Sequence, residues 1–345
     1  MANPYVFIVG CARSGTTLLL RMINAHPQIT IMREAHWISR VLEERRDLTP
    51  EGLVKPELIP YLCSDPKFAR LHVAAEELLG LLRRGQPVSF PDLVARIFDL
   101  YGQDKGKALV GNKTPSVVRR IPTFHTLWPS ARFIHLIRDG RDVCLSMADW
   151  RKAQQKKPGI FVTWKDDPVS TTALWWELSV RLGREVGNSL GRELYYEMRY
   201  ESLVSNPAKE CAALCGFLGV PYDEAMLRFH ESRTRTKPGR DAKHGWLPIT
   251  PGLRDWRSQM LGEDLERFEA AAGELLDELG YGRAVQRPRP EVLEQASKVR
   301  ASLAQDSNWN EVVSCSRAEG LDPASRIPDS RAEDLDAAGS LEGRA

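Results

Sequence analysis

The sequence has little net charge, no paired cysteines and no long apolar run, and each absence excludes a class of protein. A formal net charge of +2 over 345 residues gives no broad basic surface for nucleic acid or an acidic membrane. The six cysteines are scattered without CxxC pairs, which favours a reduced, cytoplasmic protein over a disulfide framework or a metal site. No stretch approaches the length of a membrane span, and no basic segment followed by an apolar targeting run stands at the N-terminus. We therefore expect a soluble, cytoplasmic protein without a nucleic-acid partner.

Short apolar runs alternate with helical patterns along most of the chain. Strands are predicted over residues 5–10, within 108–115, over 132–137 and within 194–203. Helices are predicted over 16–25, from about 141, over 173–187 and over 206–220. This alternation predicts an α/β fold, with a central parallel sheet flanked by helices on both faces.

The spacing of these segments also predicts how the chain is divided. Residues 1–282 are expected to form one domain, with a helical insert over about 35–105 and a basic, polar lid loop over about 151–172. Residues 283–345 are expected to form an extension with one helix at 290–304. The last part is rich in Ser, Ala, Asp, Arg and Gly, and we expect it to be disordered.

The stretch "VFIVGCARSGTTLLLRMINAHP" has the pattern of a phosphate-binding loop. A strand, a loop flanked by glycines and a helix together present backbone N–H groups and a helix dipole to one anion. Thr16 stands where a Walker lysine is expected, and Arg13 supplies the charge from inside the loop. The loop therefore suits an anion of lower charge than a triphosphate, bound without a metal. The alternative is a tight turn at Gly10 and Gly15 with Arg13 exposed to solvent.

A second candidate anion site lies in "FIHLIRDGRDVCLSM". Arg138 ends a predicted strand and Ser146 lies on the following helix, so both can converge at the carboxyl edge of the sheet. The alternative is that Arg138 pairs with Asp139 or Asp142 at the start of that helix. Two anion sites at two strand ends imply a ligand with two separated phosphates.

Together and in this order, the two motifs resemble those of the sulfotransferases that use 3′-phosphoadenosine 5′-phosphosulfate (PAPS). The segment "LYYEMRYESLVSNP" resembles a third element of that family, and the resemblance spans about residues 5–260. It implies a P-loop sulfotransferase fold. It also implies an enzyme that releases 3′,5′-adenosine bisphosphate (PAP) and uses no metal. The residues that it assigns to the 5′-phosphosulfate are Arg13, Ser14, Gly15, Thr16 and Thr17. Arg138 and Ser146 are assigned to the 3′-phosphate.

The stretch "RSGTTLLLRMINAHPQITIMREAHW" is closer to the tyrosylprotein, carbohydrate-type and bacterial branches than to the cytosolic aryl branch. The likeness implies that Glu34 is the catalytic base and that Lys113 stabilises the leaving oxygen. His36 is the substitute base, because the tyrosylprotein branch has an arginine there. The alternative for Glu34 is an ordinary salt bridge with Arg33 or Arg40.

A later basic segment, "RTRTKPGRDAKHGW", is the candidate for closing over the nucleotide. Lys237 and Arg240 are its candidate nucleotide-binding residues, and a solvated basic loop is the alternative. The expected reaction is in-line sulfuryl transfer from PAPS to a hydroxyl or amine of a small molecule, glycan, lipid or peptide, with a homodimer as one arrangement of the enzyme. The competing functions are a P-loop kinase or nucleotidase that uses ATP and magnesium, and a binding module without turnover.

Overall fold

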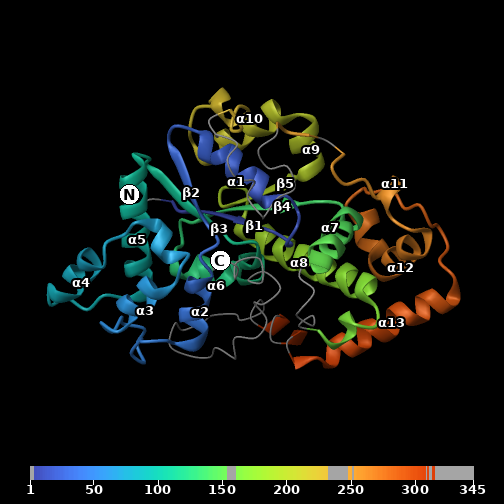
Figure 1. Ribbon diagram of the computed structural model, residues 1–345, viewed down its shortest axis with the longest axis horizontal. Helices are drawn as coiled ribbons and strands as arrows, with labels where there is room; N and C mark the ends of the chain where they lie inside the picture. Colours follow the sequence, from blue (N-terminus) through green and yellow to red (C-terminus); the bar gives the residue numbers. More distant parts are fainter. Residues whose placement is uncertain are drawn as a thin grey trace.

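A parallel β-sheet runs through the middle of the molecule (Figure 1). The computed structural model describes residues 4–153, 161–231, 248–250, 252–307, 309–310 and 313–314. Within them the strands are β1 (Val6–Val9), β2 (Ile29–Arg33), β3 (Leu109–Lys113), β4 (Arg132–Ile137) and β5 (Tyr195–Arg199). They lie in the order β2-β3-β1-β4-β5, and every pair is parallel. The predicted α/β fold with a parallel sheet is confirmed.

Helices cover both faces of the sheet, and every side chain of the central strand β1 is therefore buried. Val6 and Ile8 face one side, where they pack with α1 (Thr16–Ala25) and α10 (Pro207–Leu218). Phe7 and Val9 face the other side. The elements on that side include α5 (Phe90–Lys105), α6 (Ile121–Leu127) and the 3₁₀ helix η2 (Pro115–Arg120). Such continuous apolar runs are typical of parallel strands buried on both faces.

The expected helical insert lies beside the β2 edge of the sheet (Figure 1). Before α5 it contains α2 (His36–Glu44), α3 (Leu58–Ser64), the 3₁₀ helix η1 (Phe68–Leu71) and α4 (Ala75–Arg83). Helix α5 begins where Ser89 caps the N–H of Asp92 and ends at Gly106 in the left-handed conformation. Sequence reasoning missed strand β2, which immediately precedes the insert.

The opposite end of the molecule is built from helices around α8 (Pro168–Leu190). Helix α7 (Gly140–Ala153) and the 3₁₀ helix η3 (Val162–Trp164) precede it, so the described part of the expected lid loop is shorter than 151–172. Trp175 and Trp176 of α8 are fully buried. Helices α11 (Trp256–Gln259) and α12 (Gly262–Glu278) complete this end.

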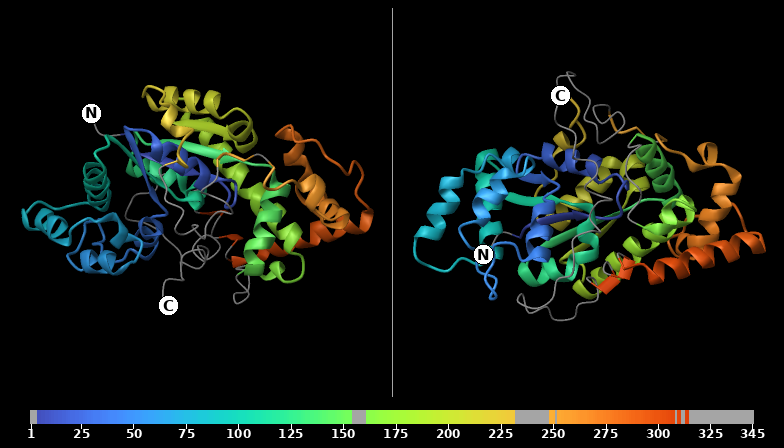
Figure 2. Two further views of the ribbon diagram at one scale, coloured as in Figure 1. Left: turned by 45° about the horizontal axis from the view of Figure 1, so that its top comes forward. Right: turned by 60° about the horizontal axis from the view of Figure 1, so that its bottom comes forward.

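The helix predicted at 290–304 is confirmed as α13 (Pro290–Gln305). Figure 2 shows that α13 runs along the outside of this end of the molecule, where it contacts α8 and α12. Its buried face consists of Ala296, Val299 and Leu303. Residues 290–305 therefore pack on the preceding domain, while the remaining predicted tail is largely outside the described residues.

Two further elements complete the sheet's surroundings. The segment predicted as a strand within 194–203 divides into β5 and the short helix α9 (Tyr200–Ser205), and η4 (Glu224–Met226) packs against α1. None of the described helices is long and apolar enough to cross a bilayer.

Candidate active site

Four of the five strands end beside one another, and a residue that the sequence singled out lies at or just after the end of each. The loop of residues 10–15 follows β1, Glu34 follows β2, Lys113 ends β3 and Arg138 follows β4. Strand β1 lies between β3 and β4, so the chain moves away from it in opposite directions along the sheet. In open parallel sheets, ligands bind outside the carboxyl ends of the strands at such a point.

The backbone of the loop after β1 takes positive φ angles at several residues. Gly15 has a φ of 96° and its Cα lies against the ring of Tyr200, so a side chain at this position would collide with that ring. Arg13 has a φ of 72°, which is uncommon for a residue other than glycine. The Gly10 N–H donates to the Pro115 carbonyl at 3.2 Å and so ties the loop to the end of β3.

The residues predicted to bind the two phosphates come together at the ends of β1 and β4. Arg13 Nε donates to Ser146 Oγ at 3.2 Å, which joins the loop to helix α7. Arg138 lies over the ring of Tyr200, with 4.2 Å from its Cζ to the ring centroid. It also donates to Asp142 Oδ2 at 3.3 Å, so the alternative pairing of Arg138 is present in this structure.

Ser14 Oγ, which is in the loop, and Arg138 Nε are among the buried polar atoms without a hydrogen-bond partner in the described part of the chain. Buried polar groups are costly to leave unsatisfied, so each indicates a ligand or water that completes it. Thr16 is buried at the first turn of α1, and Thr17 follows it.

Glu34 and Lys113 meet because β2 and β3 are neighbours in register, with Arg33 opposite Lys113. The Lys113 ammonium donates to Glu34 Oε1 at 2.5 Å. The Lys113 side chain is 3% exposed, whereas that of Glu34 is 30% exposed. The structure therefore places an ammonium deep in the site with a carboxylate nearer to solvent.

Two more basic side chains lie beside the second oxygen of Glu34. His36 Nε2 and Lys67 Nζ are each 3.7 Å from Glu34 Oε2, which is too long for a hydrogen bond. Burial alone would raise the pKa of the Glu34 carboxyl, but Lys113 and His36 outweigh it and hold this pKa well below its ordinary value. Glu34 is thus an anion in this structure, and a salt bridge with Arg33 or Arg40 is not its principal contact.

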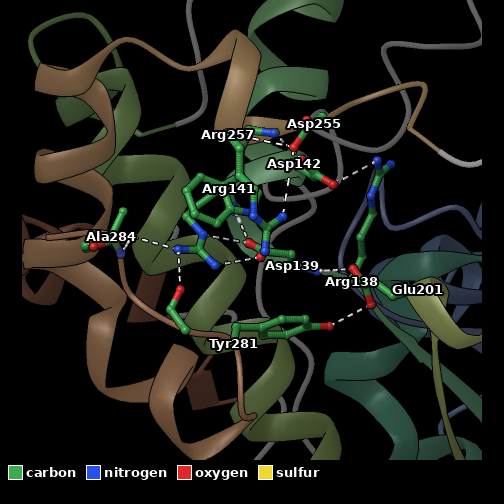
Figure 3. A network of polar contacts seen from close by, with 12 residues as sticks. Arg138, Asp139, Arg141, Asp142, Glu201, Asp255, Arg257, Tyr281 and Ala284 are labelled. Carbon is green, nitrogen blue, oxygen red and sulfur yellow. Dashed lines mark hydrogen bonds and ion pairs between the residues drawn. The ribbon is translucent and has the colours of Figure 1, made fainter.

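A buried ionic network supports the turn that carries Arg138 (Figure 3). Arg141 is fully buried and binds both oxygens of Asp139, at 3.0 and 2.7 Å, and Glu269 at 2.7 Å. Its guanidinium lies 3.6 Å from the centroid of the Trp256 ring. Such a network, with bidentate contacts and a stacked ring, fixes the backbone on which Arg138 stands.

Glu201 ties the same turn to α9 and to the C-terminal segment (Figure 3). It accepts a hydrogen bond from the Asp139 N–H at 2.8 Å and another from the Tyr281 hydroxyl at 2.8 Å. Asp142, in turn, accepts from the Trp256 N–H at 2.9 Å. Burial raises the pKa of Asp142 to about 6; Arg138 opposes this shift and Asp139 adds to it.

Sequence reasoning missed three residues of this site. Tyr200 and Glu201 lie in the quoted Arg-Tyr-Glu-x-Leu segment, which gave their position but not their contacts. Lys67 belongs to the insert and no motif pointed to it. Lys237, the candidate from the later basic segment, lies outside the described residues, as does Arg240.

The donor set fits a nucleotide that carries two separated phosphate groups. Arg13 and Arg138 supply charge, the loop supplies N–H groups and hydroxyls, and Ser146 of α7, the helix after Arg138, contacts Arg13. The described residues contain no cluster of three or more His, Cys, Asp or Glu that could hold a metal ion.

Comparison with known proteins identifies the family of this chain. A model described as the sulfotransferase family matches residues 4–224. A protein-tyrosine sulfotransferase of Drosophila melanogaster is 24% identical, over 87% of this chain and 57% of its own length. Protein-tyrosine sulfotransferase 2 of Gallus gallus is 26% identical, over 81% of this chain and 69% of its own length. This chain thus spans little more than half the length of the first of these relatives.

A solved structure shares both the fold and recognisable sequence. The sulfotransferase domain of the Synechococcus PCC 7002 olefin synthase has a TM-score of 0.57 and 26% identity, over 81% of this chain and 95% of that domain. The central parallel sheet and its flanking helices are thus those of an enzyme domain of nearly the same extent.

Proposed function

The chain belongs to the sulfotransferase family, and we propose that it transfers the sulfuryl group of PAPS to a hydroxyl or amine of an acceptor. The observation that carries this proposal is the contact of Glu34 with Lys113 beside the loop of residues 10–15. It combines a carboxylate that can accept a proton, an ammonium that can stabilise a leaving oxygen, and an anion-binding loop.

The nucleotide would be held at two places. Arg13, Ser14 and the hydroxyls of Thr16 and Thr17 would hold the 5′-phosphosulfate, and Ser14 Oγ is the buried atom that it would satisfy. Arg138 and Ser146 would hold the 3′-phosphate, to which the unpartnered Arg138 Nε would donate. When bound, PAPS supplies an activated sulfuryl group attached to a phosphate leaving group.

Glu34 would accept a proton, and Lys113 would stabilise the negative charge that develops on the leaving oxygen. Glu34 would accept the proton of the acceptor group as its oxygen or nitrogen bonds to sulfur. Lys113 would stabilise the bridging oxygen, which leaves with PAP as its bond to sulfur breaks. Because Lys113 also holds Glu34 Oε1 in this structure, we infer that it releases Glu34 when it turns to the bridging oxygen.

We propose a small molecule, glycan, lipid or peptide as the acceptor, with a peptide tyrosine among the first to test. The relatives named as protein-tyrosine sulfotransferases support the tyrosine hydroxyl. The insert of residues 35–105 reaches the site through Lys67, which lies beside Glu34, so we propose that the insert helps to select the acceptor class. A cytoplasmic location, a homodimer and the nucleotide-closing role of Lys237 stay predictions.

The test is transfer of ³⁵S from labelled PAPS, with a chelator present, to tyrosine peptides, hydroxylated lipids, sugars and folded proteins. Label on an acceptor, lost in Glu34→Gln and kept in the exposed-carboxylate control Glu294→Gln, is the expected result. Label on folded proteins alone would contradict the proposed acceptor class. Transfer of ³²P from ATP with magnesium, and none of ³⁵S, would instead support a kinase.

A further inference from the structure

We propose that Lys67, from the helical insert, is a positioning residue that takes over the Glu34 carboxylate when Lys113 turns to the leaving oxygen. This inference rests on the proposed function, in which Glu34 is the base and Lys113 moves. It gives the insert a part in the reaction itself, beyond any role in choosing the acceptor.

The local structure holds the backbone of Lys67 firmly in place. The Asp65 carboxylate accepts from the N–H of Lys67 at 2.7 Å and from the N–H of Phe68 at 3.2 Å. Phe68 is buried and meets the edge of the Trp37 ring, with 5.4 Å between centroids. Trp37 follows His36 in α2, so this packing sets Lys67 beside the start of α2 and next to Glu34. The presence of an ammonium at this point is therefore built into the fold of the insert.

The two oxygens of Glu34 have different partners. Lys113 binds Oε1 at 2.5 Å, whereas Lys67 and His36 lie 3.7 Å from Oε2. Two ammonium groups from different elements thus flank one carboxylate. Asp65 is a second anion beside Lys67, and the Lys113 ammonium acts on Lys67 as a like charge.

This arrangement makes an exchange of partners favourable. The ammonium groups of Lys67 and Lys113 repel each other, which weakens the ion pair between Lys113 and Glu34. A second anion, such as the leaving oxygen, can therefore compete with Glu34 for Lys113. Once Lys113 has turned away, Lys67 remains within one short movement of Oε2 and keeps the carboxylate in place. Without Lys67, Oε2 would keep His36 beside it but no ammonium among the described residues, and the Glu34 side chain, which is 30% exposed, would be held less firmly.

The first experiment measures the interaction without any acceptor. Lys113→Met imitates the state in which Lys113 has left, and ¹³C NMR of [¹³Cδ]glutamate-labelled protein reports the titration of Glu34. The resonance is assigned by its absence in Glu34→Gln. Adding Lys67→Met to Lys113→Met is expected to raise the pKa of Glu34 by about one unit, the usual effect of losing one nearby opposite charge.

The matched control is Lys105→Met in the same background. Lys105 is an exposed lysine that pairs with Asp104, so its removal should leave the titration of Glu34 unchanged. An equal pKa in the Lys113→Met protein with and without Lys67 would overturn the proposal. Thermal melts of each variant show that the compared proteins are folded.

The second experiment follows catalysis with the acceptor that accepts ³⁵S best. Lys67→Met is expected to lower kcat about tenfold with little change in the KM for PAPS, and Lys67→Arg to restore most of it. A more basic Glu34 would by itself raise the rate, so a fall in kcat reports lost orientation. A rise in the acceptor KM alone would show that Lys67 binds the acceptor and would overturn the positioning role.

These outcomes separate the inference from the proposed function. A fully active Glu34→Gln would remove Glu34 from the role of base and contradict the proposed mechanism. An inactive Glu34→Gln together with a Lys67→Met enzyme of unchanged kcat would leave the mechanism in place and overturn only the part assigned to Lys67.

Discussion

Replacing Arg138 with alanine tests where the 3′-phosphate binds. The Arg138 side chain is 7% exposed, lies over the Tyr200 ring and has one nitrogen without a partner among the described residues. A phosphate at this position would accept charge-assisted hydrogen bonds from the guanidinium. The variant removes those bonds. It also removes the packing of Arg138 on Tyr200, and this loss would affect every adenine nucleotide to the same extent.

The size of the effect follows from these contacts. A hydrogen bond to a charged group contributes about 1.5–3 kcal/mol, which corresponds to a factor of about 10–150 in Kd. Arg138 must give up part of its 3.3 Å contact with Asp142 when phosphate binds. We therefore expect the lower half of that range.

Calorimetry with two nucleotides isolates the contribution of the 3′-phosphate. PAP and adenosine 5′-monophosphate differ only in that group, so the ratio of their Kd values cancels the shared packing. Arg138→Ala should weaken the binding of PAP much more than that of the monophosphate, while the exposed Arg267→Ala should change neither. An equal loss for both nucleotides, or for neither, would refute the placement of the 3′-phosphate at Arg138.

Three further predictions address the base and the buried charges. Glu34→Gln should lower single-turnover rates by about 10²–10⁴ while PAP affinity is kept, and an unaffected rate would point to His36 as the base. The pKa of Asp142, raised to about 6, means that the folded state holds this proton more tightly than the unfolded state. Stability contributed by Asp142 should therefore fall as pH rises from about 4 to 6, and Asp142→Asn should be more stable than the parent at pH 7 by about 1–3 kcal/mol in urea unfolding. If Asp142→Asn had the stability of the parent, ionised Asp142 would not destabilise the folded protein at pH 7. Arg141→Met strands Glu269 in the core and should cost about 3–5 kcal/mol in the same assay; a loss below 1 kcal/mol would show that water satisfies the carboxylates.

The elements that carry the two candidate anion-binding segments could be predicted from the sequence because each of them is local. Strand β1, its loop and α1 are contiguous, and so are β4, Arg138 and α7. Parallel strands end at the same edge of a sheet, so both units were expected at that edge, and the structure adds the contact of Arg13 with Ser146. The 3.2 Å contact between them follows from topology as much as from any motif.

The other half of the site depends on contacts between distant segments. Strand β2 was missed, although Ile29, Thr30 and Ile31 are good strand formers, because it follows α1 closely and precedes a long helical insert. Without β2 the meeting of Glu34 and Lys113 had no geometric basis, and both assignments came from the family resemblance. Lys67 reaches Glu34 only through the packing of Phe68 on Trp37, which no local pattern records.

The buried network behind Arg138 has the same origin. Arg141 and Asp139 are neighbours in an evident motif, but Glu269 comes from α12, a helix that was not predicted. Tyr281 reaches Glu201 from the C-terminal side in the same way. Tertiary packing brings these partners together, and periodicity in a single sequence does not specify it.

Every step proposed for this chain depends on its binding a phosphosulfate nucleotide, and thermal unfolding with two ligands measures that binding without an acceptor. A ligand that binds only the folded state raises the Tm by an amount that grows with the logarithm of its concentration relative to its Kd. PAP in the presence of a chelator is expected to raise the Tm progressively, and ATP with magnesium is expected to have little effect. Stabilisation by ATP with magnesium alone would contradict the account and identify the loop as a nucleoside triphosphate site.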